Sequence, residues 1–267
     1  MGRPGHRRGG MRGLRRLRHD LNMIVTRFGS LRTAARRLAG RGHPVTYGLI
    51  ALCAIVFLLG PVSGFTTAYG TGERLVAAQY AYYDRWGVIP AELFRGRAEE
   101  ALTPLTALFV HGGWLHLLGN LLFLHVFGGM LEERMGPVRY LLFYLGCGYL
   151  ALLGYAAAFA DSAQPLVGAS GAISAVLGAF LHVLPKARVT TLLPFLLFLP
   201  VRVPAWVVLP FWAALQWIAA RRGGEGPGVA YLAHLIGFAL GFLYAWTRSG
   251  SLRVRTPATA TEGDSKP

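Results

Sequence analysis

The sequence predicts an all-α membrane protein, a bundle of six transmembrane helices with both termini in the cytoplasm. Of its 267 residues, 54% are hydrophobic and only 15% are charged, whereas soluble domains carry about 25% charged residues. The mean hydropathy is +0.43. A helix needs about 20 apolar residues to cross a bilayer, and the apolar stretches between Val45 and Thr247 are long enough for six crossings.

Residues 1–42 form a basic cytoplasmic tail that precedes the membrane domain. The tail is rich in Arg and Gly and contains one acidic residue, Asp20. Its stretch LNMIVTRFGSLRTAARRLAG has the composition of a basic amphipathic helix on a membrane surface. Mitochondrial transit peptides are also Arg-rich and acid-poor, so that alternative stays open. The net charge of +15 is interpreted as a signal that sets the orientation of the protein in the membrane or as a contact with anionic lipid. No recognisable nucleic-acid-binding motif accompanies the charge, so no nucleic-acid partner is expected.

Five of the six predicted spans are continuous apolar stretches at residues 45–64, 113–131, 138–160, about 170–184, and 228–247. A long amphipathic connection separates the first span from the second, and loops of this length usually have a function. Residues 249–267 are polar, and we expect a disordered C-terminal tail there. The membrane domain therefore covers residues 43–248.

The segment between the fourth and sixth spans, residues 189–220, is too long for one span and too short for two spans joined by a turn. It is interrupted by Pro194, Pro200, Pro204 and Pro210. We expect residues 189–202 to lie at the membrane interface and residues 203–220 to form the fifth span. With six spans both termini share one side, and most of the arginines then lie on that side, as the positive-inside rule requires of the cytoplasm.

Four polar residues in the predicted spans are candidate functional residues, because polar groups in lipid are costly. They are His116, Asn120, Ser170 and His234. His116 and Asn120 are four residues apart and therefore lie on the same face of a helix. A hydrogen bond between helices is the alternative explanation for such a pair.

Ser170 begins a predicted helix between Gly168 and Gly171. Glycines let other backbone approach closely and leave N–H groups open to a ligand, and the unpaired N–H groups of a helix start favour negative charge. A plain N-cap is the alternative role for such a serine.

His234 precedes Gly237 and Gly241, which form a stripe of small residues that lets a neighbouring helix approach closely. If that neighbour is the helix that starts at Ser170, a hydroxyl and an imidazole meet. Such a pair is the chemistry of a nucleophile and its base.

The two other histidines in the predicted spans and the two cysteines are predicted to be structural or interfacial. These are His125, His182, Cys53 and Cys147, the two cysteines as free thiols in apolar spans. His111 and His116 lack a third converging ligand, so no metal site is expected. No HExxH motif of a zinc protease is present in the sequence.

Three motifs together resemble the rhomboid family of intramembrane serine proteases. The family pattern places HxxxN on the second span, GxSG at the start of the fourth and AHxxGxxxG on the sixth, and this chain has HLLGN, GASG and AHLIGFALG in that order. The resemblance covers about residues 45–247. It implies a six-span rhomboid-like bundle that hydrolyses peptide bonds in or near the transmembrane segments of single-pass membrane proteins, without a cofactor.

The resemblance also implies roles for the candidate residues. Ser170 would be the nucleophile and His234 the general base, in a dyad without an acidic third member. Asn120, His116 and the backbone N–H of Ser170 would stabilise the oxyanion. Because no intramembrane acid can complete a triad, we expect packing to orient the imidazole.

Further positions match or depart from the family pattern. Glu132 and Arg134 resemble a structural ion pair at the cytoplasmic edge, and His111 resembles a loop-positioning histidine. Ser174 stands where some members carry a tyrosine beneath the catalytic histidine. The connection RAEEALTP before the second span lacks the Trp-Arg that the family often has there.

The alternative function is a rhomboid-like pseudoprotease or scaffold that binds membrane proteins without cleaving them. Such proteins typically lose the serine or the histidine, and this chain keeps both. The expected partners are single-pass substrates and membrane lipid, and no oligomeric state is predicted. The expected location is a bacterial cytoplasmic membrane, with the mitochondrial inner membrane as the alternative.

Overall fold

A computed structural model describes residues 42–95, 99–193, 199–222 and 230–252. The chain divides into two units, residues 1–43 and residues 44–267, and the description below concerns the second. The amphipathic helix predicted in the basic tail lies outside the described residues. So does most of the predicted C-terminal tail, whose first residues form the short helix α12 (Ser249–Leu252).

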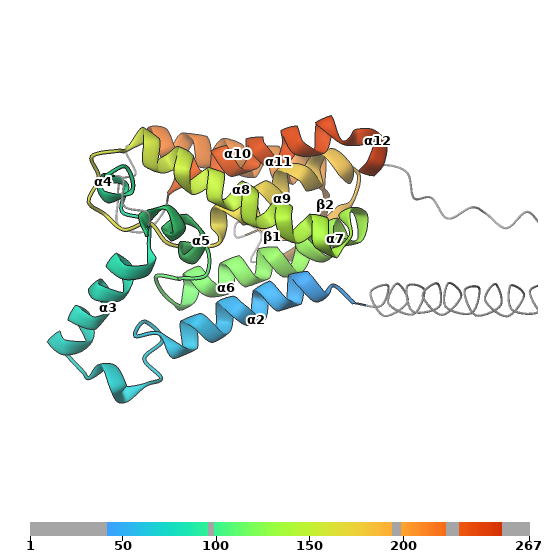
Figure 1. Ribbon diagram of the computed structural model, residues 1–267. Coiled ribbons are helices and arrows are strands. Elements are labelled where there is room, and N and C mark those ends of the chain that lie inside the picture. The colour runs from blue at the N-terminus through green and yellow to red at the C-terminus, as the bar shows by residue number, and fades with distance from the viewer. Residues whose placement is uncertain (1–41, 96–98, 194–198, 223–229, 253–267) are drawn as a thin grey trace, which may run out of the picture. The chain divides into compact units, whose positions relative to one another are not determined.

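Helices make up most of the second unit (Figure 1). The long ones are α2 (Pro44–Leu59), α3 (Glu73–Trp86), α8 (Pro137–Ala158), α9 (Ser170–Val183), α10 (Ala205–Arg221) and α11 (Tyr231–Thr247). One continuous helix, Trp114–Met135, consists of α6 (Trp114–Phe123), the π-helical turn η3 (Leu124–Gly128) and α7 (Gly129–Met135). The short ones are η1 (Thr67–Tyr69), α4 (Pro90–Leu93), η2 (Glu100–Leu102) and α5 (Thr103–Ala107).

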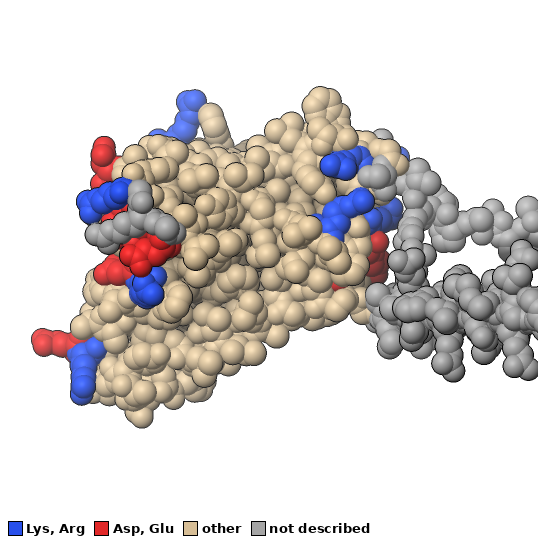
Figure 2. Space-filling view, viewed as in Figure 1, with Lys and Arg blue, Asp and Glu red and all other residues tan. Residues whose placement is uncertain are grey.

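Each of the six predicted spans contains one of these helices. Two helices, Trp114–Met135 and Pro137–Ala158, are long and apolar enough to cross a membrane by length and composition, and α2, α9 and α11 are apolar but shorter. On the face shown in Figure 2, charged side chains lie toward the two ends of the unit, and the band between them carries none. Helix α2 begins and α12 ends at the same end of the unit (Figure 1). Six crossings and their orientation stay predictions.

The described residues of segment 189–202, which was expected at the interface, lie in two paired strands, so the fold is mostly helical rather than purely helical. Strand β1 (Arg188–Leu193) pairs antiparallel with β2 (Leu199–Pro204), with Val189 opposite Val203. Valines and threonines favour strands, and prolines are tolerated here because both strands of a two-stranded sheet are edges. Helix α10 begins directly after Pro204 rather than at residue 203.

The long connection between α2 and α6 is tied by its backbone to the segment before α9. Val88 and Leu166 exchange two backbone hydrogen bonds, of 2.9 and 2.7 Å, and the N–H of Gly168 donates to the carbonyl of Ala107 at 2.9 Å. These bonds hold the segment that leads into Ser170, and so they contribute to placing the serine.

Helices α9 and α11 are in backbone contact along most of their length. A Cβ on Gly237 would overlap the carbonyl oxygen of Gly171, and a Cβ on Gly241 would overlap that of Ala175. Because these pairs advance together along both helices, α9 and α11 run parallel. Their N-terminal ends therefore lie side by side, as the small-residue stripe on the sixth span predicts.

The carboxylate of Glu132 holds the N-terminus of α2. Its oxygens accept hydrogen bonds from the backbone N–H groups of Val45 (3.0 Å) and Thr46 (2.8 Å) and from the hydroxyl of Thr46 (2.7 Å). Within the described part of the chain, Glu132 forms these bonds and not the expected ion pair with Arg134. The reason is that the first N–H groups of a helix lack partners in the helix and attract a negative charge.

Candidate active site

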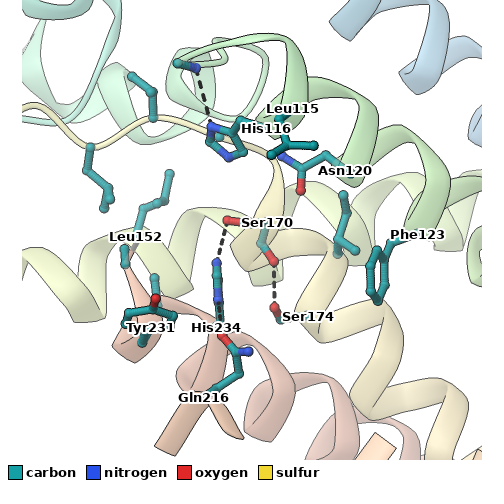
Figure 3. A pocket seen from close by; sticks show the side chains of 18 of the residues that line it. Leu115, His116, Asn120, Phe123, Leu152, Ser170, Ser174, Gln216, Tyr231 and His234 are labelled. Carbon is teal, nitrogen blue, oxygen red and sulfur yellow. Dashed lines mark hydrogen bonds between the residues drawn. The ribbon is translucent and has the colours of Figure 1, made fainter. Parts of the chain in front are cut away.

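A pocket of about 730 Å³ lies between α6, α9, α10 and α11. The four polar candidates from the predicted spans, His116, Asn120, Ser170 and His234, all line it (Figure 3). The tertiary structure thus brings together side chains that are up to 118 residues apart in the sequence, His116 to His234.

Ser170 and His234 are hydrogen-bonded to each other. The Nε2 atom of His234 lies 2.8 Å from the Oγ atom of Ser170. Ser170 is the first residue of α9, and His234 lies in the first turn of α11. The glycine contacts between these two parallel helices bring the two side chains within hydrogen-bonding distance.

The other ring nitrogen of His234 has a partner that the sequence analysis missed. Its Nδ1 atom lies 2.8 Å from the Oε1 atom of Gln216, a residue of α10 that also lines the pocket. The imidazole is therefore held by a hydrogen bond as well as by packing. The available signal was the cost of an amide inside a predicted span, the same signal that singled out Asn120.

Aromatic rings flank the imidazole of His234. The ring centroid of Trp212 on α10 is 6.1 Å away, with the planes tilted by 30°, and that of Tyr231 on α11 is 6.3 Å away in a T-shaped arrangement. Ser174, the position at which the sequence departs from the motif pattern described above, donates its hydroxyl to the carbonyl of Ser170 at 2.6 Å. In this chain, α10 and α11 supply the rings next to the histidine.

His116 approaches the segment before Ser170 closely. Gly168 has a φ of +126°, and a Cβ on it would lie 2.7 Å from the Nε2 atom of His116, so only glycine fits there. The Nδ1 atom of His116 accepts a hydrogen bond from the N–H of Gly112 at 3.4 Å. An accepting nitrogen carries no hydrogen, so the proton of the neutral ring is on Nε2, which faces the serine segment.

Asn120 supplies a second donor. Its side chain is buried, and its Nδ2 atom has no hydrogen-bond partner among the described residues. Buried donors without a partner are rare in native proteins and call for an explanation, such as a bound ligand. A donor of this kind in the wall of the pocket fits the stabilisation of a negative oxygen during reaction.

His111 lies just before α6 and is almost fully buried. Its ring meets that of His116 edge to face at 5.2 Å, and its Nδ1 atom lies 3.3 Å from the carbonyl oxygen of Phe109. Burial, with a smaller contribution from repulsion by His116, lowers the pKa of His111 to about 4. His111 is therefore neutral at physiological pH and packs beside His116.

The other singled-out side chains lie away from the pocket. The Nδ1 atom of His125 is 3.4 Å from the hydroxyl of Tyr47, and the Nε2 atom of His182 is 2.8 Å from the hydroxyl of Ser249. Cys53 and Cys147 are buried free thiols. Among the described residues, no group of three or more His, Cys, Asp or Glu side chains is arranged to hold a metal ion.

Comparisons with known proteins point to one family. A family model described as a rhomboid domain matches residues 98–251, more than half of the chain. Rhomboid protein 1, mitochondrial, of Saccharomyces cerevisiae is 34% identical over 142 residues, an alignment that covers 52% of this chain and 39% of the yeast protein. The rhomboid protease GluP of Bacillus subtilis is 31% identical over 169 residues, covering 61% of this chain and 29% of that protein.

A third relative is matched over more of its length. The rhomboid protease GlpG of Serratia proteamaculans is 27% identical over 228 residues, which cover 85% of this chain and 69% of that protein. The chain thus spans less than half the length of the first two relatives and about two thirds of the third.

Proposed function

Because the chain belongs to the rhomboid family, we propose that it is an intramembrane serine endopeptidase with Ser170 as nucleophile and His234 as general base. Family membership and the relatives named proteases support an intramembrane protease. The single observation that carries the assignment of residues is the 2.8 Å hydrogen bond between His234 Nε2 and Ser170 Oγ. A base within this distance of a hydroxyl can remove its proton as the hydroxyl attacks.

The proposed reaction follows from this geometry. The Oγ atom of Ser170 forms a bond to the carbonyl carbon of the substrate peptide while its proton passes to Nε2 of His234. The electron pair of the C=O double bond moves to oxygen, and the C–N bond then breaks as His234 gives the proton to the leaving amine. A water molecule then forms a bond to the acyl carbon while its proton passes to His234, and the C–Oγ bond breaks as His234 returns the proton to Ser170 Oγ.

The negative oxygen formed in this reaction would be held by three donors. They are the backbone N–H of Ser170, the Nδ2 of Asn120 and the Nε2–H of His116. The first is at the start of a helix, where N–H groups lack partners, and the second is buried and has no partner among the described residues. Donors already in place at such an oxygen need no reorganisation during the reaction.

The proposed substrates are single-pass membrane proteins. The pocket lies among helices and is lined largely by apolar side chains, so it suits a segment taken from lipid. A regular helix hides its peptide bonds, and we therefore expect substrates with helix-weakening Gly or Pro near a small residue at the cut.

We infer six crossings by α2, Trp114–Met135, α8, α9, α10 and α11, with residues 43–248 as the membrane domain. The start of α2 and the end of α12 lie at the same end of the unit (Figure 1), as an even number of crossings requires. Both termini would be cytoplasmic, and the pocket would open toward the other side, where α6 and α11 begin. The proposed location is a bacterial cytoplasmic membrane, and the mitochondrial inner membrane is the alternative that the yeast relative illustrates.

The test is cleavage in reconstituted vesicles. The wild type, the Ser170→Ala variant and the control Ser162→Ala, which changes a serine in the loop before α9, are each incubated with a panel of single-span substrates. We expect cleavage by the wild type and the control and none by Ser170→Ala. Cleavage by Ser170→Ala would overturn the nucleophile assignment, and binding of substrates without cleavage by any protein would favour the scaffold.

A further inference from the structure

The structure assigns to Gln216 a role in orienting the catalytic histidine: we propose that its amide carbonyl is the third member of the active site. This inference rests on the proposed function, because it concerns the same dyad. Gln216 touches no reacting atom and acts through His234, so it is a positioning residue. It replaces the carboxylate that serine proteases with a triad use at this place.

The hydrogen bonds form an unbroken chain from α10 to the nucleophile. Gln216 Oε1 lies 2.8 Å from His234 Nδ1, and His234 Nε2 lies 2.8 Å from Ser170 Oγ (Figure 3). An amide oxygen can only accept a hydrogen bond, so Nδ1 must carry the proton of the neutral ring. Nε2 then presents its lone pair to the serine hydroxyl, which is the tautomer that a general base needs.

The position of Gln216 on α10 supports a dedicated role. Its neighbours Leu215, Trp217 and Ile218 are exposed apolar residues on the outer surface of the helix. Gln216 and Trp212, one helical turn apart, instead line the pocket. Because an amide in a membrane helix is costly without a partner, the bond to His234 accounts for a polar residue in this apolar helix.

Helix α10 therefore places two side chains next to the imidazole. Gln216 is hydrogen-bonded to Nδ1, and the ring centroid of Trp212 lies 6.1 Å from that of the imidazole, with the planes tilted by 30°. Ser174 of α9 is too small to reach under the ring, and its hydroxyl is bonded to the backbone of Ser170. In this chain, the orientation of the catalytic base depends on α10 being packed against α11.

The bond also matters after proton transfer. When Nε2 takes the serine proton, the ring becomes a cation, and the Nδ1–H to carbonyl bond becomes charge-assisted and stronger. The amide stays neutral throughout, and no proton passes to it. An uncharged acceptor stabilises the imidazolium less than a carboxylate does, so its loss costs less than the roughly 10⁴-fold loss that follows disruption of an aspartate triad.

The kinetic test uses two substitutions with opposite expectations. Gln216→Leu keeps a similar volume and removes the acceptor, whereas Gln216→Glu keeps an acceptor oxygen. We expect Gln216→Leu to lower kcat by about 10- to 100-fold, the range for leaving one buried donor unpaired, with little change in KM. Gln216→Glu should restore most of the turnover. The control Leu215→Ala, on the outer surface of α10, should leave both constants unchanged.

A spectroscopic test reads the tautomer directly and needs no substrate. In full-length protein labelled with ¹⁵N-histidine, the signals of His234 are identified by their loss in His234→Asn. We expect the Nδ1–H tautomer in the wild type and in Ser170→Ala, and a shift toward Nε2–H in Gln216→Leu. A structural role for Gln216 would lower the melting temperature without changing the tautomer.

The outcomes separate this inference from the proposed function. Cleavage by Ser170→Ala overturns the proposed function, whereas wild-type kcat and an unchanged tautomer in Gln216→Leu overturn the role of Gln216 alone. If Gln216→Leu fails to fold, Gln216→Asn, which is one methylene shorter and cannot reach Nδ1 at 2.8 Å, takes its place. A wild-type tautomer and kcat in Gln216→Asn would likewise overturn the inference.

Discussion

At the residue scale, the pocket holds polar groups whose hydrogen bonds identify them as donors or acceptors. The proton of His116 is assigned to Nε2 because Nδ1 accepts from Gly112, and that of His234 is assigned to Nδ1 because Gln216 accepts there. The two histidines are thus neutral in opposite tautomers, one suited to donate into the pocket and one suited to accept from Ser170. Their different neighbours produce this difference, since the side chain is the same.

Asn120 is expected to contribute to turnover rather than to folding. Asn120→Ala removes the Nδ2 donor that has no partner among the described residues, so kcat should fall by about 10²–10³-fold, the effect of losing one oxyanion donor. Kinetics in vesicles measure this. His125→Ala, on the same continuous helix but away from the pocket, is the control and should keep full kcat. A normal kcat for Asn120→Ala would remove Asn120 from the site.

His111 is expected to make the protein sensitive to acid. Its pKa is about 4 in the folded protein and about 6.5 in the unfolded chain, so the unfolded state binds more protons between these values. The contribution of His111 to the free energy of unfolding should be fully present above pH 6.5. Below that pH it should fall by about 1.4 kcal/mol per pH unit until about pH 4. Melting temperatures of the wild type and His111→Gln in detergent measure this. The variant should show a flatter decline, and parallel declines would contradict the assignment.

At the element scale, the approach of two helices decides whether the site exists. Gly237 and Gly241 let α11 touch the backbone of α9, and the two helices run parallel, so their first turns meet. A second device at this scale is the carboxylate of Glu132, which joins the helix Trp114–Met135 to the start of α2. Both contacts involve the backbone of the partner helix. Glycines are needed where α11 touches the backbone of α9, and a carboxylate is suited to accept from the N–H groups at the start of α2.

Gly241→Ala should separate α9 from α11. The added methyl would overlap the carbonyl oxygen of Ala175, and overpacking of this kind costs about 1–3 kcal/mol. We expect a lower melting temperature and loss of most activity, because Ser170 and His234 move apart. Gly146→Ala is the matched control, since a Cβ there meets nothing within 4 Å. It should be neutral or slightly stabilising, and equal effects of the two variants would contradict the contact.

Glu132→Ala should loosen the start of α2. It removes the acceptor of three hydrogen bonds from Val45 and Thr46, so two backbone N–H groups lose their partner, at about 1–3 kcal/mol each. Thr46→Val removes the hydroxyl donor alone and should cost less. Melting temperatures and proteolysis near residue 44 measure this series. A larger loss in Thr46→Val than in Glu132→Ala would contradict it.

At the scale of the whole molecule, the described unit has two charged ends and an uncharged band between them on the face in Figure 2. The start of α2 and the end of α12, which are the first and last described helices, both lie at one of these charged ends (Figure 1). The pocket is lined by the start of α6 and the start of α11. Both lie at the opposite end of the unit (Figure 1), which is the non-cytoplasmic end under the proposed topology and would give water access to the pocket.

The six-span topology is testable with reporter fusions. A fluorescent protein, which folds in the cytoplasm, and alkaline phosphatase, which is active outside it, are fused after Leu252 and after Asp161. We expect fluorescence without phosphatase activity after Leu252 and the reverse after Asp161, because three spans separate these sites. The same result at both sites would overturn six crossings.

The sequence by itself indicated the membrane character, the approximate helices and four of the polar residues that line the pocket, because lipid penalises charges and unpaired polar groups at every position. That penalty singles out His116, Asn120, Ser170 and His234, but Gln216, His125 and His182 carry it too, so it does not by itself separate pocket residues from the others. Only the tertiary structure decided which groups meet. Gln216 binds the Nδ1 atom of His234, Glu132 binds the start of α2 instead of Arg134, and strand β1 pairs with strand β2. Each depends on the distance between elements far apart in the chain, and hydrogen bonds form only within a few tenths of an ångström of their optimum, which residue patterns along one helix do not encode.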